Sequence, residues 1–569
     1  MNAIPPPAYA LPTFPYRRAP EQDGARPRRP VAVVGGGLSG LTAACDLAVR
    51  GIPVVLLDED DTVGVRGASS RGICYAQRSL EIFERLGLYD RVRDKGVTWS
   101  VGRVMLEDEE LYNFDLALGS ASRQPPFVNL QQFYVEWFLV DRLAELPLAD
   151  LRWKNRVVGA EQFDDHVLLQ VETPEGAYPL EAAWVIDASG LASPLRGALG
   201  AQARSSPGVD RWCISDVRFS KPLPPERWTW VQAAFNEGRA VWQHQMADGV
   251  WRIDYQLDPN SDPAEASLPE VVQKRLAAHL GADTEFETVW VGPWGYRTHL
   301  LDDFRNGRVF FAGDAAHVFS PFGARGGNSG IQDAENIAWK LAAVIRGEAG
   351  EALLDTYSAE RRPAAQHNIR TTERSARFLA PRSRFERALR DAVLDLAREH
   401  AFARHVVNMG RMSDPFRYAD SPLTTNGGEA VPNLRLRFAD GAETSLAALL
   451  RGEGARFLLL AGAASGVTAA PASVAVGAPS SCAAASPVPN AAASSAPVVA
   501  TSSVPVVTAF AAGGASGQLP VLLGPDLGAL LAPEEALLIR PDGHLAARLR
   551  APTPEDLAAA LRRALGAPA

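Results

Sequence analysis

The sequence is poor in cysteine and has no excess of positive charge. Its 569 residues include four cysteines, Cys45, Cys74, Cys213 and Cys482, with neither a CxxC pair nor metal-ligand spacing. This argues against a disulfide framework and predicts no metal site, so a reducing cytoplasm is the expected location. The net charge of -9, with an isoelectric point near 5.6, gives no overall attraction to nucleic acid or anionic lipid.

The sequence also lacks a long uninterrupted apolar segment. Residues 457–524 carry no charge, but proline, glycine and serine leave no run of the roughly 20 apolar residues that span a bilayer. Their composition is typical of a low-complexity linker or insertion, placed at 461–518. Residues 1–29 lack the apolar centre of a signal peptide and are predicted to be a flexible tail. No membrane partner is therefore expected.

What the sequence does contain, near its start, is a βαβ pattern. Val31–Val34 is a short apolar run of the kind found in buried strands, and Ser39–Arg50 has a helical pattern. Val54–Leu57 repeats the strand pattern. A strand, a helix and a second strand at this spacing predict the first unit of a parallel sheet.

Glycines join the first strand to the helix. Gly35, Gly37 and Gly40 have the GxGxxG spacing. The first permits a tight turn, the second lets backbone approach a pyrophosphate, and the third lets helix and strand pack closely. Asp58, at the end of the second strand, is placed to accept a hydrogen bond from a ribose hydroxyl. The arrangement predicts a dinucleotide site.

A second motif follows a predicted strand at Arg308–Ala312. It begins with Gly313, Asp314 and His317, and a glycine-rich loop then leads into a helix predicted over Ser329–Ile345. The carboxylate suits a sugar-like hydroxyl chain, and the helix N-terminus stabilises negative charge such as that of a reduced flavin. Each residue alone also fits a structural role, Asp314 as a helix cap and His317 as a core hydrogen-bonding group.

The remaining patterns predict an α/β protein of several domains. Residues 30–412 form the main domain, 413–460 connect to a C-terminal domain, and 519–569 complete that domain. The expected elements are helices at Ser79–Leu86, Phe133–Leu146, 356–412 and Pro554–Leu565, a strand at Trp184–Asp187, an antiparallel sheet within 208–300, and a C-terminal hairpin around Pro541-Asp542-Gly543.

The second motif resembles a known family over its full length. The segment GRVFFAGDAAHVFSPFGARGGNSGIQDAENIAWKLA is similar to the second FAD motif of the class A flavoprotein monooxygenases, which have the p-hydroxybenzoate hydroxylase fold. The resemblance covers about residues 31–380. The C-terminal RPDGHLAARL further resembles the thioredoxin-like tail of the 3-(3-hydroxyphenyl)propionate and phenol hydroxylase branch, here without a CxxC.

The resemblance implies a Rossmann-like FAD-binding domain with an interleaved antiparallel-sheet substrate domain, a helical segment and a small thioredoxin-like domain. It implies hydroxylation of a phenolic ring, in which NAD(P)H reduces FAD and O2 gives a flavin C4a-hydroperoxide. Carried over by position, the residues expected to bind FAD are Gly35, Gly37, Gly40, Asp58, Arg71, Gln132, Gly313, Asp314, Pro321, Gly326, Gly327 and Asn328. The partners expected are a small aromatic substrate and O2.

Two departures from the family pattern stand out. Ser189-Gly190 occupies the place of an Asp-Gly pair in the middle motif, which puts nucleotide handling in question. The glycine-rich loop Pro321–Asn328, here called the flavin loop, departs from the family at two positions. Arg325 stands where a small residue or glutamine is common, and Gly327 stands where methionine is common. An arginine beside the ring would pair with an acidic substrate or tune the flavin, which makes Arg325 a candidate catalytic residue.

The substrate is expected against the antiparallel sheet. Trp212 and Trp230 are candidate apolar walls, and His244, Arg252 and Tyr255 are candidate catalytic residues. Core packing is an alternative role for each of the five.

Three other functions stay open at this stage. A flavin-dependent epoxidase is chemically close to a hydroxylase. A halogenase is suggested by Trp228-x-Trp230 alone, without the rest of that motif. A non-catalytic flavin-binding protein is the third alternative. The sequence leaves open the choice between NADH and NADPH, and between a monomer and a homodimer.

Overall fold

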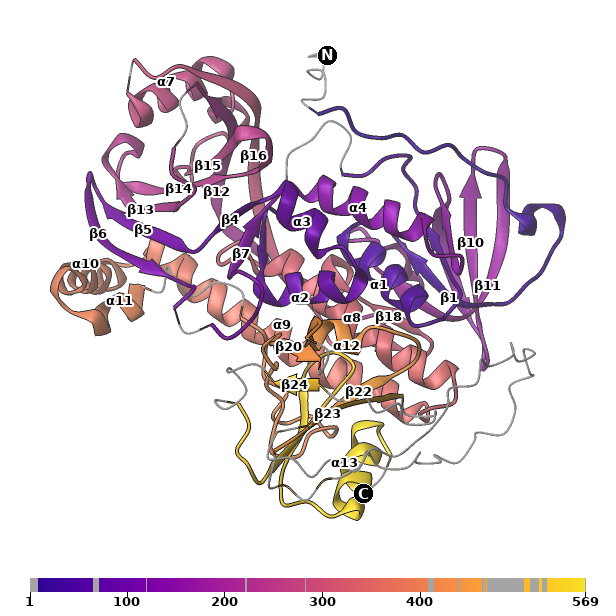
Figure 1. The fold of residues 1–569 in the computed structure, drawn as a ribbon. Coiled ribbons are helices and arrows are strands. Elements are labelled where there is room, and N and C mark those ends of the chain that lie inside the picture. Colours follow the sequence, from indigo (N-terminus) through magenta and orange to yellow (C-terminus); the bar gives the residue numbers. More distant parts are fainter. Residues whose placement is uncertain are drawn as a thin grey trace.

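The computed structural model describes most of the chain. The described residues are 9–64, 71–118, 120–220, 223–281, 283–407, 414–438, 441–462, 465, 467, 506–511, 521–523 and 530–567. They form a larger body with two eight-stranded sheets and a smaller C-terminal part, which lies below that body in Figure 1. No helix among these ranges has both the length and the apolarity to cross a membrane.

The first sheet contains the predicted βαβ unit. Strand β1 (Arg29–Val34) pairs in parallel with β2 (Val54–Leu57), and α1 (Leu38–Val49) connects them. On its other side β1 pairs in parallel with β11 (Gly176–Asp187), which pairs with β18 (Val309–Phe311). The carboxyl ends of β1, β11 and β18 therefore lie together, which is where such sheets bind ligands. The other strands of this sheet are β8 (Ala149–Arg152), β9 (Arg156–Gln162), β10 (Val167–Thr173) and β17 (Arg305–Asn306).

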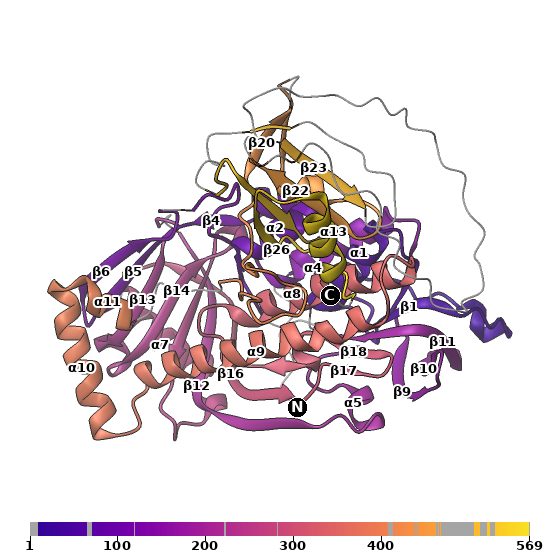
Figure 2. The same ribbon diagram turned by 90° about the horizontal axis from the view of Figure 1, so that it is seen from below.

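The second sheet stands beside the first and holds the predicted antiparallel strands (Figures 1 and 2). Its central strands, in spatial order, are β16 (Phe286–Leu301), β12 (Ala203–Phe219), β15 (Val250–Gln256), β14 (Arg239–Gln245) and β13 (Arg227–Ala233). Its remaining strands are β5 (Val101–Leu106), β6 (Glu109–Asp115) and β19 (His317–Val318). Helices α6 (Pro263–Ala266) and α7 (Pro269–Leu280), which the strand prediction missed, interrupt the run.

Helices lie between and around the sheets. In Figure 2, α8 (Arg325–Ile345) and α9 (Ala352–Leu379) cross the molecule beside both sheets. Helix α8 begins at Arg325, before the predicted Ser329. The other elements of the main body are α2 (Gln77–Leu86), α3 (Tyr89–Lys95), α4 (Gln132–Ala144), α5 (Pro194–Ala198), α10 (Arg384–Glu399), α11 (Ala401–Val407), β3 (Cys74–Ala76), β4 (Val97–Trp99) and β7 (Phe127–Asn129).

The segment predicted to be a flexible tail is packed against the body over residues 9–29. Glu21 is 3% exposed and pairs with Arg152 at 2.9 Å, and Phe14 stacks on Trp153 with ring centroids 4.6 Å apart. A buried carboxylate with an arginine partner holds its segment in place. The prediction of flexibility was wrong for these residues, because a Pro- and Arg-rich composition does not reveal one buried ion pair. Residues 1–8 lie outside the described ranges.

The C-terminal part is built on a four-stranded sheet. Its order is β23 (Val506–Ala511), β22 (Arg456–Ala461), β25 (Glu535–Ile539) and β26 (Leu545–Arg550), with every neighbouring pair antiparallel. The predicted hairpin is β25–β26, and α13 (Pro554–Ala564) follows it. Strand β23 lies inside the segment predicted as low-complexity linker. The likeness to thioredoxin stays a prediction. Also present are α12 (Leu446–Leu450), β20 (Arg435–Phe438), β21 (Glu443–Ser445) and β24 (Val521–Leu523).

Buried ion pairs connect this part to the main body. Arg540, in the hairpin, is fully buried and pairs with Glu360 of α9 at 2.5 Å and with Asp542 at 2.5 Å. Glu360 also accepts from Lys340 of α8 at 2.8 Å. The cationic partners hold the pKa of Glu360 well below its usual range although burial opposes this, so the carboxylate stays ionised.

The hairpin arginine can be tested by substitution. We expect Arg540→Ala to lower the free energy of unfolding by about 3–5 kcal/mol, because it leaves buried carboxylates without their partner. The measurement is chemical denaturation followed by fluorescence. Arg550→Ala, on the same hairpin, removes an ion pair whose arginine side chain is 78% exposed and is expected to leave the free energy of unfolding nearly unchanged. Equal losses in the two variants would contradict the assigned role of the network.

Candidate functional site

The first glycine motif forms a tight turn that only glycine allows. Gly35 has φ +102°, and a Cβ there would lie 2.6 Å from the carbonyl oxygen of Ala188. A Cβ on Gly40 would lie 1.9 Å from the carbonyl oxygen of Gly35. These contacts pull the start of α1 against the ends of β1 and β11. The packing assigned to Gly35 and Gly40 from the sequence agrees with this geometry.

Gly37 differs from its two neighbours in the motif. It caps α1 with extended backbone, φ -82°, and a Cβ there would meet no protein atom within 4 Å. Helix α1 has no side-chain cap, so its first N–H groups and the positive end of its dipole face the same open side. This is the surface that a pyrophosphate requires.

Asp58 lies beside this turn, at the end of β2. Its Oδ2 accepts a hydrogen bond from the N–H of Gly36 at 2.5 Å, and its Oδ1 accepts from the N–H of Asp60 at 2.8 Å. Burial raises the pKa of Asp58, while the two backbone donors act in the opposite direction. Each carboxylate oxygen keeps a lone pair for a ribose hydroxyl.

The second motif packs directly on the first. Ser39 lies in the first turn of α1. A Cβ on Gly313 would lie 2.4 Å from the Oγ of Ser39, and a Cβ on Gly330 would lie 2.2 Å from the same oxygen. Gly313 also has φ +58°. The two motifs, almost 300 residues apart in the sequence, therefore meet where three small residues permit close backbone approach.

His317 has the structural role that was its alternative in the sequence. Its Nε2 lies 2.6 Å from Oδ2 of Asp333 on α8, and the same oxygen accepts from the N–H of Gly313 at 3.0 Å. Arg361 of α9 pairs with the other oxygen at 2.6 Å. The charges of His317 and Arg361 lower the pKa of Asp333 to about 2 against the opposing effect of burial. Asp333 thus fixes the motif to α8.

Asp314, Arg71 and Gln132 lie near one another. The surrounding protein raises the pKa of Asp314 by desolvation, and the charges of His317 and Arg71 oppose this. The residue is nevertheless exposed at the surface, so it faces an open side of the site. Gln132 begins α4, accepts from the N–H of Gly72 at 3.1 Å and donates to Glu136 at 2.8 Å. These contacts hold the segment that carries Arg71 beside Asp314.

The flavin-loop residues end at the N-terminus of α8. Pro321 accepts through its carbonyl from the N–H of Ala324 at 3.0 Å, and Ala324 has φ +54°. Helix α8 has no side-chain cap, and a Cβ on Gly326 would meet no protein atom within 4 Å. A second uncapped helix N-terminus with backbone open on one side is thereby aimed at the same region as α1.

Two predicted residues of this loop direct their side chains into the protein. The Asn328 amide accepts from Ala76 N–H and Ser79 Oγ and donates to the carbonyl of Cys74, so only its backbone is left for a cofactor. Arg325 is 3% exposed and donates to Asn368 of α9 at 2.9 Å. Burial lowers the pKa of Arg325, and the charge of Asp414 opposes this. A direct role for the Arg325 guanidinium at the ring gains no support from these contacts.

The unusual middle motif keeps a closed loop. Asp187, at the end of β11, accepts from the N–H and Oγ of Ser189, at 3.0 and 2.6 Å, and from Ser193 Oγ. Arg196 lies 2.9 Å from His299 and donates to the carbonyl of Ala315 at 3.2 Å. The serine at 189 therefore adds a hydrogen bond to Asp187.

Three predicted substrate residues share one face of the second sheet. His244 is the cross-strand partner of Arg252, which is in turn the partner of Asp216, so their side chains point the same way. Trp212 is on this face too and stacks on Trp242 at 4.4 Å. Phe322 of the flavin loop lies edge-on to Trp242 at 4.9 Å, so this face is turned toward the loop.

Tyr255 and Trp230 belong to the opposite face. Tyr255 is fully buried, and its hydroxyl lies 2.9 Å from His279 of α7. Trp230 packs against the same histidine with ring centroids 4.9 Å apart. Because side chains alternate along a strand, Tyr255 cannot share a face with Arg252. A catalytic role for Tyr255 therefore gains no support from the structure.

Three charged residues on the loop-facing side, Asp216, Asp254 and Arg227, were not predicted from the sequence. Arg252 pairs with Asp216 at 3.3 Å and lies 4.0 Å from Asp254, and Arg227 lies over the ring of Trp242 at 5.9 Å. Buried charges on a sheet are rare unless they have a function or a partner. The spacing Arg252-x-Asp254 was a usable signal, because it places both side chains on one face.

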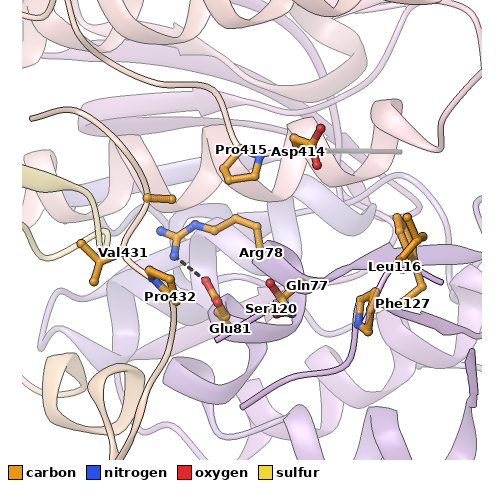
Figure 3. A pocket seen from close by; sticks show the side chains of 12 residues that line it. Gln77, Arg78, Glu81, Leu116, Ser120, Phe127, Asp414, Pro415, Val431 and Pro432 are labelled. Carbon is orange, nitrogen blue, oxygen red and sulfur yellow. Dashed lines mark hydrogen bonds and ion pairs between the residues drawn. The ribbon is translucent and has the colours of Figure 1, made fainter. Parts of the chain in front are cut away.

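A cavity of about 190 Å³ lies elsewhere, between α2 and the connection to the C-terminal part (Figure 3). Arg78 and Glu81, paired at 2.9 Å, lie at one side, and Leu116 and Phe127 lie at the other. None of the predicted FAD residues lines it. Over the part of the chain that the structure describes, no cluster of potential metal ligands occurs.

Comparison with known proteins identifies relatives of this chain. Residues 28–372 match the family model described as FAD binding domain. The chain is 30% identical over 430 residues to 6-methylpretetramide 4-monooxygenase of Streptomyces rimosus, covering 72% of this chain and 73% of that protein. It is 29% identical to a 3-(3-hydroxy-phenyl)propionate/3-hydroxycinnamic acid hydroxylase of Mycolicibacterium gilvum, covering 71% of this chain and 69% of the relative.

Solved structures give a similar picture over more of the chain. OxyS anhydrotetracycline hydroxylase from Streptomyces rimosus superposes with a TM-score of 0.66 and 25% identity, covering 95% of this chain and all of the other.

Gly37 provides a test of the site that leaves packing untouched. We expect Gly37→Ala to fold normally, since its Cβ meets no protein atom, but to weaken FAD binding about tenfold or more by occupying the pyrophosphate position. FAD titration of the apoprotein and its thermal midpoint measure the two effects.

Two further alanine variants serve as controls for Gly37→Ala. Gly197→Ala on α5 also meets no protein atom within 4 Å and is expected to change neither quantity. Gly40→Ala is expected to lower both, because its Cβ would overlap the Gly35 carbonyl. Unchanged FAD affinity in Gly37→Ala would remove this turn from the FAD site.

Proposed function

The chain belongs to the FAD-binding family of flavoprotein monooxygenases, and we propose that it uses NAD(P)H and O2 to hydroxylate a phenolic substrate. The observation that carries this proposal is the meeting of two uncapped helix N-termini, those of α1 and α8, with a buried polar sheet face turned toward the same loop.

The residues present fit FAD. Gly37 and the N-terminus of α1 would hold the pyrophosphate, Asp58 the ribose of the adenosine half, and Asp314 the ribityl chain. Backbone of Gly326 and Gly327 would lie along the flavin ring, with the α8 dipole favouring its negative charge when reduced. The open space at Gly37 supports this assignment, because a side chain there would exclude a phosphate.

The protein's part in the reaction is to bind, orient and exclude water. Bound FAD would supply the redox chemistry that couples NAD(P)H and O2 to hydroxylation of the ring. Trp212, Trp242 and Phe322 provide an apolar aromatic wall on the loop-facing side of the sheet. An apolar wall excludes water from the place where the oxygen atom would be transferred.

The relatives support a phenolic substrate. One is named for 3-(3-hydroxyphenyl)propionate, a single-ring phenol, and another for the polycyclic 6-methylpretetramide. We propose that this chain takes a phenol of one of these two kinds. Replacement by serine at 189 is compatible with use of a nicotinamide nucleotide, because Asp187 keeps its hydrogen bonds within the loop.

A halogenase finds no support in the sheet. Trp228 and Trp230, which suggested it, stack on each other at 5.7 Å on the face away from the flavin loop. The names of the relatives favour a monooxygenase over a non-catalytic protein. An epoxidase, which transfers the same oxygen atom, is separated from a hydroxylase only by its product.

The proposed function is tested with the purified holoenzyme and a panel of phenols. We expect phenol-stimulated oxidation of NADH or NADPH, matching uptake of O2, and a product heavier by one oxygen atom that mass spectrometry detects. A panel of matched alkenes separates epoxidation. Reduction of bound FAD by neither nucleotide, with every phenol present in turn, would contradict the proposal.

A further inference from the structure

Two arginines, two aspartates and a histidine lie close together on the loop-facing side of the second sheet. Arg252 of β15 is the cross-strand partner of His244 on β14 and of Asp216 on β12, and Arg227 of β13 lies over the ring of Trp242 on β14. Asp254, two residues beyond Arg252, projects from the same face beside Trp242 and Ile214. The structure thus concentrates two arginines and two carboxylates against an aromatic wall.

The two carboxylates differ in their partners. Asp216 is fully buried and lies 3.3 Å from Arg252 Nε. Asp254 Oδ1 accepts no hydrogen bond within the described part of the protein, and Arg252 Nε lies 4.0 Å from it. The Asp254 side chain is 15% exposed. A buried carboxylate oxygen without a donor is costly, so its retention calls for a function.

Other polar atoms on this face are also unsatisfied. Trp212 Nε1, Trp242 Nε1 and His244 Nδ1 are buried and have no hydrogen-bond partner among the described residues. The indole nitrogens are donors only, whereas an ionised carboxylate is an acceptor only. The face therefore offers one acceptor and at least two donors to a molecule that contacts it.

We propose that Asp254 holds the hydroxyl group of the aromatic substrate and accepts its proton. The inference rests on the proposed function and adds to it a catalytic residue and a substrate class. The donors beside Asp254 suit a hydroxylated aromatic that also carries a carbonyl or carboxylate oxygen, because such a molecule satisfies both kinds of group.

The proton transfer balances without another reactant. The substrate O–H bond breaks, an O–H bond forms at Asp254 Oδ1, and the electron pair stays on the substrate oxygen. That negative charge makes the ring positions ortho and para to it more nucleophilic. After oxygen transfer, the substituted ring carbon loses its hydrogen to solvent as a proton, and Asp254 returns its own proton to the substrate oxygen.

The surroundings suit Asp254 to this role near neutral pH. Burial raises its pKa to about 6, with Asp216 adding to the rise and Arg252 and Arg227 opposing it. His244 stays neutral, because burial and the same two arginines lower its pKa well below 6.5. Cys74 of β3, also within range of Asp254, has a pKa raised to about 11 by burial and is neutral. The carboxylate therefore forms above pH 6, and activity that depends on it falls as the pH drops through 6.

The experiment uses FAD-loaded wild type and Asp254→Asn. The probes are 3-(3-hydroxyphenyl)propionate and 2-naphthol, each beside its methyl ether, and binding is read from the absorbance of bound flavin. We expect the variant to bind both hydroxyl compounds about tenfold more weakly and the ethers equally. For a probe that is turned over, kcat falls about 100-fold and the acid limb near pH 6 disappears.

Two further variants complete the test. Asp258→Asn removes an exposed carboxylate that pairs with Arg239 just beyond the same strand, and is expected to behave as wild type. Asp254→Glu keeps a carboxylate and is expected to regain an acid limb.

The outcomes separate this inference from the proposed function. Equal hydroxyl binding and turnover in wild type and Asp254→Asn would overturn the Asp254 assignment alone. Loss of FAD from Asp254→Asn and Asp254→Glu together would overturn it as well, by giving the carboxylate a structural role. Failure of wild type to bind either hydroxyl probe would overturn the proposed function, and the substrate class inferred from this face with it.

Discussion

The site depends on close packing at four glycines of its two motifs. Gly35 and Gly40 bring the start of α1 onto the turn after β1, and Ser39 then fits against Gly313 and Gly330. Since a Cβ at any of the four glycines would overlap another atom, the two helix N-termini can converge only with this sequence. The charge that the site offers follows from that steric constraint, because uncapped helix ends act together on an anion only when they point at the same place.

The sequence predicted most of this first layer because its signals are local. The strand at Val31–Val34, the helix after it and the glycine spacing all lie within one supersecondary unit, and the structure confirms each. The tail failed as a prediction because its order comes from Glu21 meeting Arg152, a contact over more than a hundred residues. Helix α7 was missed because a strand pattern on either side masked it.

In the second sheet, the sequence predicts which residues share a face but not the surroundings of that face. Alternation tells which residues share a face, so Arg252 and Asp254 could have been grouped and Tyr255 set apart from the sequence alone. It does not tell which face is turned toward the flavin loop. That depends on Phe322 meeting Trp242, a contact between segments that no local pattern links. The inward charges were therefore visible in the sequence, but their common environment was not.

The C-terminal part is connected to the site through α8. The beginning of this helix carries Gly326 and Gly327, its middle carries Asp333, which holds the second motif, and farther along Lys340 pairs with Glu360. Because Arg540 of the C-terminal hairpin binds that same Glu360, the hairpin and the glycine loop are fixed to opposite ends of one rigid helix. Replacing a buried charged cluster by apolar residues often stabilises a protein, so stability alone does not account for this one. The arrangement of the cluster does account for it. Directional ion pairs set the rotation and depth of α8, which apolar packing specifies less sharply, and the proposed orientation of this helix toward the flavin depends on both.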